Sequence, residues 1–319
     1  MRLKGPVKHK IIFIVGPTAT GKTDLSIKLA RLIKGEIISC DSMQVYRGME
    51  ILSQAPSSRD RRKAPHHLIG ILDPRREYSA ASFRKRALDL IRSIIERKRI
   101  PIITGGSGLY AKALVDGLFP SPPADIKFRR KMQAFALRHG SARLHQKLAA
   151  IDPDSARTIH PNDTRRIIRA LEIYHSTTRT MTELKSRTKG LGADFDVRMF
   201  GLNAPREELY ARIESRVDRM FERGVVAEVK KLKEKKLSKT ARSVLGFKEI
   251  SDYLNGRYGL EEAKAFLKRN TRRFAKRQLT WFKADNRIIW HDISKNDYDS
   301  IVRDVVSRLG IANKSRARK

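Results

Sequence analysis

The residues with the clearest chemical meaning form a glycine-rich segment from Gly16 to Thr23. Its eight residues are Gly16, Pro17, Thr18, Ala19, Thr20, Gly21, Lys22 and Thr23, and they match the pattern G-x-x-x-x-G-K-S/T. Such loops bind phosphate through backbone N–H groups at a helix N-terminus, with the lysine as a mobile cation. The Thr23 hydroxyl is the expected ligand for Mg²⁺. We therefore expect the loop to hold substrate phosphates, although the pattern alone does not say which compound carries them.

Further polar residues follow two other short apolar runs. Asp41 comes directly after residues 36–40, and a glycine-rich turn over residues 104–110 follows residues 100–104. If both runs are parallel strands, these residues lie at the carboxyl edge of the sheet, where open α/β proteins bind ligands. Asp41 is then a candidate general base or Mg²⁺ ligand, and the alternative is a carboxylate that caps a turn or helix.

The elements that must position these residues alternate between strand-like and helical patterns. Short apolar runs predict buried strands over residues 11–15, 36–40, 100–104, 197–202 and 287–290. Apolar residues at helical spacing predict helices over residues 23–33 and 82–96. This alternation predicts an α/β fold, a P-loop core with a parallel sheet flanked by helices.

The alternation stops after Gly117. A proline-rich connector follows, and the next stretch is helix-like and poor in strands. We therefore expect a core made of residues 1–118 and 197–312, whose C-terminal part is helical, and a helical insertion over residues 119–196. Residues 313–319 are expected to form a basic tail.

The charge of the chain predicts a polyanionic partner. The sequence has 69 Lys+Arg against 34 Asp+Glu, a formal net charge of +35, so nucleic acid is the first expected partner and an anionic membrane surface the second. The single cysteine, Cys40, excludes an intramolecular disulfide. No apolar run reaches the length of a signal-peptide core or a membrane span. We expect a cytoplasmic protein without a membrane partner, and a monomer.

Several segments, taken in order, resemble the tRNA dimethylallyltransferase family, whose members isopentenylate an adenine adjacent to the anticodon. The matching segments are GPTATGKT (16–23), DSMQVYRGM (41–49), PHHL (65–68), YSAASF (78–83), GGSGLY (105–110), IHPND (159–163), residues 165–172, GFKE (246–249) and AKRQLTW (275–281). They extend over nearly the whole chain. The resemblance implies a P-loop core with a helical insertion, as the residue pattern also predicts.

The resemblance implies a specific chemistry for the phosphate loop. The loop would grip the diphosphate of dimethylallyl diphosphate with the help of Mg²⁺, and no ATP need be hydrolysed. Asp41 would be the general base for the exocyclic N6 of the adenine, and Ser107 would position that base or the donor. Pyrophosphate leaves once its charge is neutralised, which suits an arginine. We nominate Arg216 for this role, with Arg242 as the other candidate.

The resemblance also implies that the helical C-terminal part of the core and the insertion both bind tRNA, through a set of contacts. They are Asp41, Ser42, Met43, Gln44 and Ser107 in the catalytic region, Arg129, Arg165, Arg166, Ile167, Ile168 and Arg169 in the insertion, and Lys276, Arg277 and Gln278 near the end of the chain. Two positions depart from the family pattern. Ser107 stands where threonine is more common, and Ala55 replaces a lysine.

Two predicted helices are rich in cations. Arg165 and Arg169 fall on one face without matching acids, and residues 268–283 carry two rows of basic residues spaced four apart. Like charges at this spacing repel each other, and bound RNA would remove the repulsion. A solvated charged face is the alternative. Four further residues are expected in turns or in the core rather than in a metal site or a base-stacking platform: His66, His67, Trp281 and Phe282.

Two other functions fit parts of the sequence. A P-loop kinase or ATPase that acts on RNA would use the same loop and charge, and Lys22→Ala would abolish its ATP turnover. A non-catalytic RNA-binding protein would use the loop as a structural nucleotide site, and Asp41→Ala would leave its RNA binding unchanged. Prenyl transfer is favoured because the ordered motifs cover nearly the whole chain.

Overall fold

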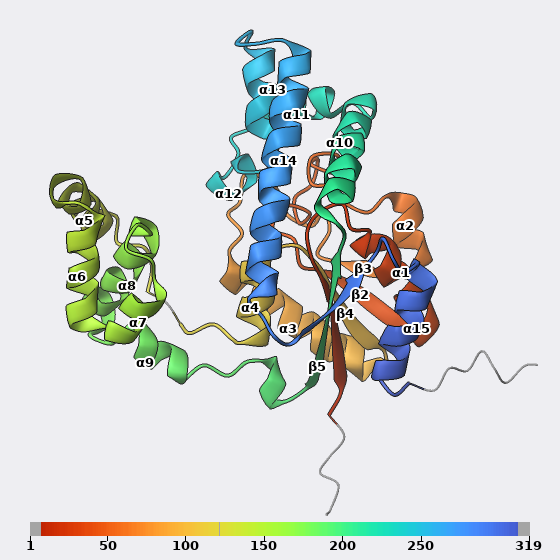
Figure 1. Ribbon diagram of the computed structural model, residues 1–319, viewed down its shortest axis with the longest axis horizontal. Coiled ribbons are helices and arrows are strands. Elements are labelled where there is room, and N and C mark those ends of the chain that lie inside the picture. The colour runs from red at the N-terminus through yellow and green to blue at the C-terminus, as the bar shows by residue number, and fades with distance from the viewer. Residues whose placement is uncertain (1–7, 121, 312–319) are drawn as a thin grey trace, which may run out of the picture. The chain divides into compact units, whose positions relative to one another are not determined.

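The computed structural model describes residues 8–120 and 122–311, and Figure 1 shows its helices and strands. The chain divides into two compact units. The core unit consists of Met1–Val115 and Leu191–Lys319, and the insertion unit consists of Asp116–Gly190. The basic tail expected at residues 313–319 lies outside the described residues.

The core unit contains a six-stranded sheet whose neighbouring strands are all parallel. In chain order the strands are β1 (Lys10–Val15), β2 (Gly35–Ser39), β3 (His66–His67), β4 (Ile100–Gly105), β5 (Asp196–Asn203) and β6 (Ile288–Asp292). Their order across the sheet is β3-β2-β4-β1-β5-β6. All five predicted strands are present. The sixth, β3, was missed because two histidines carry no strand pattern.

Helices cover both faces of this sheet, which confirms the predicted α/β fold. Successive side chains of a strand point to opposite faces, so along β1 Phe13 enters one core and Ile14 the other. The helices of this unit are α1 (Lys22–Ile33), α2 (Ser58–Lys63), α3 (Ala80–Glu96), α4 (Gly108–Val115), α10 (Arg206–Glu222), α11 (Val225–Lys233), α12 (Lys239–Arg242), α13 (Phe247–Leu254), α14 (Leu260–Lys283) and α15 (Tyr298–Arg308), with a short 3-10 turn η1 (Leu191–Ala193). The first core receives side chains from α3, α4, α11 and α14, and the second from α1 and α15.

The described part of the insertion unit is helical, as predicted. Its helices are α5 (Ile126–His139), α6 (Ser141–Ile151), α7 (Pro153–Thr158), α8 (Thr164–Thr177) and α9 (Met181–Ser186). A small core of apolar side chains from α6, α7 and α8 holds them together. At its edge the buried carboxylate of Glu172 accepts bonds from Arg129 Nε (2.8 Å) and from the backbone N–H of Asp125 (2.7 Å), and it also binds Arg169.

Candidate active site

The phosphate loop connects β1 to α1, and its two glycines have conformations that other residues rarely adopt. Gly16 has φ +134°, and a Cβ there would lie 2.4 Å from the carbonyl oxygen of Leu202. Gly21 has φ +72° and caps the N-terminus of α1. Backbone N–H groups at this helix start are donors for phosphate oxygens.

Two side chains from distant helices hold the loop at Thr18. Arg216 of α10 donates from Nη1 to the Thr18 hydroxyl (3.0 Å) and from Nε to Gln54 Oε1 (2.6 Å). Gln278 of α14 accepts from the Thr18 backbone N–H (2.9 Å) and donates from Nε2 to the carbonyl oxygen of Gly106 (2.9 Å). The loop is therefore tied to α10, to α14 and to the turn after β4.

Lys22 of the loop and Arg216 beside it are both shielded from water. Lys22 donates from Nζ to the carbonyl oxygen of Pro17 (2.5 Å). Burial, followed by the nearby Arg216, lowers the pKa of Lys22 to about 7, and Asp41 opposes this shift. Burial also lowers the pKa of Arg216 to about 10, against the effect of Asp41. Desolvated cations side by side favour a multivalent anion, because an anion stabilises the charged form of both.

Asp41 and Ser107 meet at the carboxyl ends of β2 and β4. Asp41 Oδ1 accepts from the backbone N–H groups of Met43 (2.8 Å) and Gln44 (3.4 Å), so it caps the turn as well as facing the site. The Ser107 hydroxyl accepts from the backbone N–H of Ser42 (3.1 Å). Burial raises the pKa of Asp41, while the two backbone bonds and the charges of Lys22 and Arg216 lower it. The carboxylate is thus a desolvated base beside two cations.

Lys22, Arg216, Asp41 and Ser107 line one cavity of about 1150 Å³ in the core unit. The residues singled out from the sequence that line it are Thr18, Ala19, Gly21, Lys22, Thr23, Asp41, Ser42, Met43, Gln44, His66, Ser107, Arg216, Arg277 and Gln278. Gly16, Pro17, Thr20 and Lys276 are not among the described residues that line it. Ala55, which replaces the family lysine, also lines it. The cavity is large enough for a diphosphate ester and a nucleobase together.

The sequence analysis missed several lining residues. Arg212, Arg219 and Arg223 line the cavity with Arg216, and their spacing along α10 puts them on one helical face. That periodicity was available in the sequence. Gln54, the partner of Arg216, belongs to no motif, and no sequence signal identifies it.

Some sequence-predicted residues lie elsewhere. Arg242 is exposed on α12 and is not among the described residues that line the cavity, which leaves Arg216 as the better candidate for the diphosphate. Phe282 is in the core as predicted, but Trp281 is 38% exposed, so the expectation that it is buried is wrong. His67 Nε2 pairs with Glu36 (2.7 Å). In the part of the chain that the structure describes, no group of three or more His, Cys, Asp or Glu side chains is placed to hold a metal ion.

The predicted basic helices have more acidic partners than the sequence indicates. In the insertion unit Arg129 and Arg169 bind Glu172, and Arg166 lies 3.3 Å from Asp163. The absence of matching acids that we expected on this helix is therefore wrong for Arg166 and Arg169. Ile167 and Ile168 are buried in the insertion core, so their side chains are not available for RNA. Arg165 is exposed.

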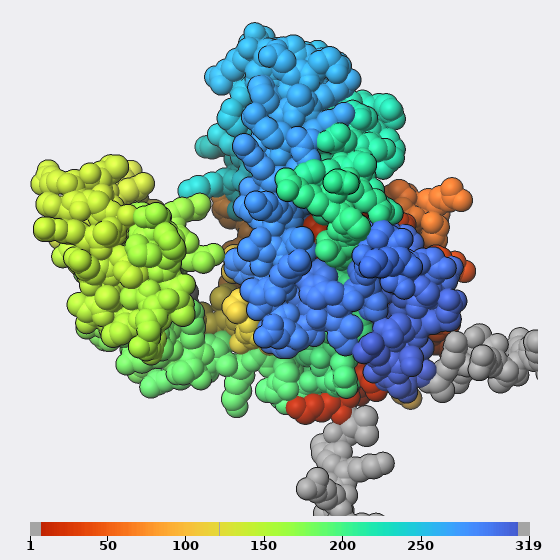
Figure 2. Space-filling view, in the orientation of Figure 1, coloured from red at the N-terminus to blue at the C-terminus, as the bar shows by residue number. Residues whose placement is uncertain are grey.

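The same correction applies to α14, whose cations were expected to repel one another. Lys268 pairs with Asp218 (2.8 Å), and Arg272 pairs with Glu214, both acids being on α10. Figure 2 shows that the surfaces of α10 (green) and α14 (blue) adjoin. Lys276 and Arg277 are exposed on α14.

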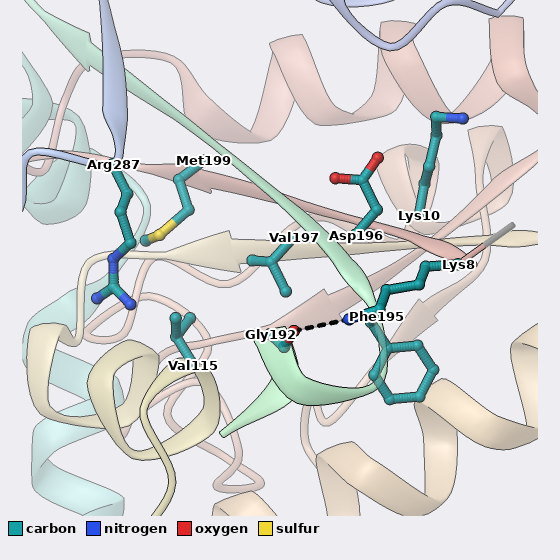
Figure 3. A pocket seen from close by; sticks show the side chains of 9 residues that line it. All are labelled: Lys8, Lys10, Val115, Gly192, Phe195, Asp196, Val197, Met199 and Arg287. Atoms are coloured by element: carbon teal, nitrogen blue, oxygen red, sulfur yellow. Dashed lines mark hydrogen bonds between the residues drawn. The ribbon is translucent and has the colours of Figure 1, made fainter. Parts of the chain in front are cut away.

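A second, smaller cavity of about 580 Å³ lies at the amino ends of β1 and β5, opposite the phosphate loop (Figure 3). Its lining includes Lys8, Lys10, Asp196 and Arg287. Lys8 Nζ donates to the carbonyl oxygens of Gly192 (3.2 Å) and Ala193 (2.7 Å). It contains none of the residues that the sequence motifs assign to chemistry.

Among the described residues, no helix combines the length and the apolar character needed to cross a lipid bilayer.

A parallel sheet with a phosphate loop after β1, and a desolvated carboxylate in the cavity beside that loop, define a P-loop protein of the group-transferring class. The family model for IPP transferase matches residues 44–285, and that for isopentenyl transferase matches residues 9–74. The chain belongs to the IPP transferase family.

Relatives and solved structures agree with this assignment. The tRNA dimethylallyltransferase of Halothermothrix orenii is 47% identical over 94% of this chain and 92% of its own length, and that of Carboxydothermus hydrogenoformans is 47% identical over 96% and 99%. The crystal structure of a tRNA isopentenylpyrophosphate transferase from Bacillus halodurans has a TM-score of 0.70 and 42% identity, covering 95% of this chain and 96% of that chain. A eukaryotic dimethylallyltransferase acting on tRNA has a TM-score of 0.77 and 31% identity, covering 94% and 80%.

Proposed function

We propose that this protein transfers a dimethylallyl group from dimethylallyl diphosphate to N6 of an adenine adjacent to the anticodon of tRNA, and releases pyrophosphate. One observation carries the proposal: the phosphate loop and the Asp41–Ser107 pair line the same cavity. The relatives that cover nearly all of the chain are named for the same activity. The exposed cations Arg165, Lys276 and Arg277 are the proposed contacts to the RNA, so both units take part in binding it.

The donor end of the site is suited to a leaving pyrophosphate. The C–O bond between the dimethylallyl carbon and the diphosphate breaks, and negative charge grows on the departing oxygen. Loop N–H groups, Lys22 and Arg216 stabilise that charge. They are fixed in advance by the bonds at Thr18 and Gln54, so little reorganisation is needed during the reaction.

The acceptor end of the site is suited to an adenine amine. The N6 lone pair is delocalised into the ring, so N6 needs a proton acceptor as it forms the new C–N bond. Asp41 accepts that proton, and the Ser107 hydroxyl positions the adenine next to Asp41. The adenine must leave the anticodon-loop stack to reach Asp41, which costs less in a loop than in a duplex.

The donor set fits a hard divalent cation that is held mainly by the substrate. Thr23 lines the cavity beside the loop, and the carboxylates of Asp24 and Asp41 line the same cavity. Mg²⁺ commonly binds through one or two protein oxygens together with substrate phosphates and water. When bound, Mg²⁺ would neutralise charge on the diphosphate.

The test is direct. Purified protein is incubated with unmodified tRNA, dimethylallyl diphosphate and Mg²⁺, and the RNA is digested and analysed by mass spectrometry. We expect one adenosine that has gained one dimethylallyl group in place of one proton. Folded protein that gives no modified adenosine would refute the proposal, and ATP turnover stimulated by RNA would favour a P-loop kinase or ATPase instead.

A further inference from the structure

Trp281 is exposed next to Gly108, the residue that follows Ser107. Its Cδ1 lies 2.2 Å from the position that a Cβ on Gly108 would occupy, so the indole packs directly against the backbone that follows Ser107. The ring is nevertheless 38% exposed, and the neighbouring Leu109 is 55% exposed. Figure 2 shows α4 (yellow) at the surface beside α14 (blue). An exposed apolar surface therefore adjoins the turn that contains Ser107.

The indole continues a series of aromatic and cationic side chains along α14. Phe274 and Arg277 line the cavity, and the Arg277 guanidinium lies 5.7 Å from the centre of the Phe274 ring. Trp281 is four residues after Arg277 and seven after Phe274, so the three share one face of the helix. Alternating aromatic rings and cations are typical of surfaces that bind single-stranded nucleic acid.

We infer that Trp281 stacks on an unpaired base of the RNA next to the adenine that enters the cavity. The inference rests on the proposed function, because an adenine that reaches Asp41 leaves its neighbour in the loop without a stacking partner. The exposed indole packs against Gly108, the residue after Ser107, so it adjoins the part of the site proposed for the adenine. Lys276 and Arg277 add the positive charge that a phosphate backbone requires, which favours RNA over an apolar protein partner.

Fluorescence of the indole provides a specific test, because the chain has only two tryptophans, Trp281 and Trp290. Trp290 is on β6, where it packs over Gly201. In a Trp290→Phe protein the only indole is Trp281, and an anticodon stem-loop should quench its emission. The matched control is Trp281→Phe, in which the emission of Trp290 should not change. Two further stem-loops each carry an abasic site, one on the 5′ side and one on the 3′ side of the target adenine. One of the two should no longer quench the emission of Trp281.

Binding measured by the anisotropy of a labelled stem-loop provides a second test. Trp281→Ala should raise the Kd roughly tenfold, the effect expected for one lost stacking contact, and Trp281→Phe should restore most of the affinity. Thermal melting identifies any variant that has not folded. Unquenched Trp281 in a saturated complex, or an unchanged Kd in folded Trp281→Ala, would overturn the inference even if the wild-type protein prenylates tRNA. Quenching without prenylation would instead contradict the proposed function.

Discussion

The active site places a carboxylate between two cations without forming a direct ion pair with either. Asp41 uses Oδ1 to bind the backbone of its own turn, while Lys22 and Arg216 bind Pro17, Thr18 and Gln54. Direct pairing would neutralise both the base and the anion site. Rigid turns that hold the charges apart keep Asp41 available for a proton and the cations available for phosphate.

Asp41→Asn isolates the charge of the base. Asparagine retains an oxygen that can accept from the Met43 N–H, so the turn is preserved. We expect kcat to fall by about 10²–10⁴, the usual contribution of general base catalysis, with little change in the Kd for tRNA. Single-turnover prenylation and RNA binding measure the two quantities. A variant with nearly normal kcat would exclude Asp41 as the base.

Lys22 makes binding of the diphosphate dependent on pH. Its pKa in the folded protein is about 7, against an ordinary value of 10.5. A bound anion favours the charged form of Lys22 and therefore raises its pKa. At a pH between the pKa of the free protein and the higher pKa of the complex, binding takes up a proton. The affinity for pyrophosphate should therefore fall as the pH rises above about 7.

Calorimetry at pH 8 in two buffers of different ionisation enthalpy measures the proton uptake. Lys22→Arg is the matched control, because arginine is charged at every pH used and the titration of pyrophosphate itself is unchanged. We expect the variant to take up fewer protons. Equal uptake by the two proteins would show that Lys22 is already charged before the anion binds.

At this scale the sequence indicated the candidate reactive residues but not the contacts that support them. Thr18, Lys22, Asp41 and Ser107 belong to local motifs, and local motifs are visible in a sequence. Gln54 acts through a bond to a residue far along the chain, and such a pairing depends on the tertiary fold. The exposure of Trp281 also depends on the fold, because it results from the packing of α14 against Gly108.

At the scale of elements, α14 connects both halves of the site. Its Gln278 is buried between the phosphate loop and the turn after β4, and a Cβ on Gly106 would lie 2.1 Å from Gln278 Nε2. The glycine thus makes room for the amide. We propose that Gln278 positions the phosphate loop against the turn of Ser107, and the tRNA contact implied by the family resemblance stays a prediction.

Gln278→Leu should loosen the phosphate loop. The variant leaves the Thr18 N–H and the Gly106 carbonyl without these partners, and each lost bond costs about 1 kcal/mol. We expect the KM for the donor to rise roughly tenfold, with a smaller change in the Kd for tRNA. Thr280→Ala, on the exposed side of the same helix, is the control. A lower melting temperature with an unchanged KM would indicate a purely structural role.

The insertion unit depends on one buried carboxylate. Glu172→Gln keeps an acceptor for the Asp125 N–H but removes the charge that Arg129 and Arg169 bind. Because both arginines are partly exposed, we expect a loss of about 2 kcal/mol in the free energy of unfolding, below the range for fully buried pairs. Urea unfolding followed by circular dichroism measures it, and Lys131→Gln on the exposed face of α5 is the control.

The pKa of Glu172 predicts a pH dependence of the same stability. Burial raises the pKa of Glu172, but the bonds from Arg129, Arg169 and Asp125 lower it by more. The pKa therefore lies below its ordinary value of 4.5. The stabilisation is complete above that value and is lost as the pH falls through the lowered pKa. Wild-type stability that does not change with acid relative to Glu172→Gln would contradict this account.

Most elements could be predicted from the sequence because each has a local period. The five longer strands and helices such as α1 and α3 follow from apolar spacing, whereas α2 buries no side chain and was not predicted. The acids of α10 that pair with cations of α14 are far away in the sequence. Considering the basic residues of α14 alone therefore overestimated the repulsion between them. Such pairs form only when two helices pack, and the sequence pattern does not show which helical faces contact each other.

At the scale of the whole molecule, the net charge of +35 sets how binding depends on salt. Many of the basic residues described above pair with acids, so the total charge overstates the number of phosphate contacts. We expect the exposed cations at the cavity and on α8 to be the ones that contact phosphates and release counterions from the RNA. Affinity should therefore fall steeply with salt, but with a slope set by these few residues.

Arg165 is the residue with which to measure this slope. The log of the binding constant for tRNA should fall linearly with the log of the salt concentration, by about 0.7–0.9 per phosphate contacted. Arg165→Ala should weaken binding to all tRNA sequences alike and reduce the slope by about one. Arg198→Ala is the control, because Arg198 lies near the amino end of β5 and pairs with Asp196 (2.7 Å). If both variants change the slope equally, the RNA responds to the overall charge of the protein and not to a defined surface on α8.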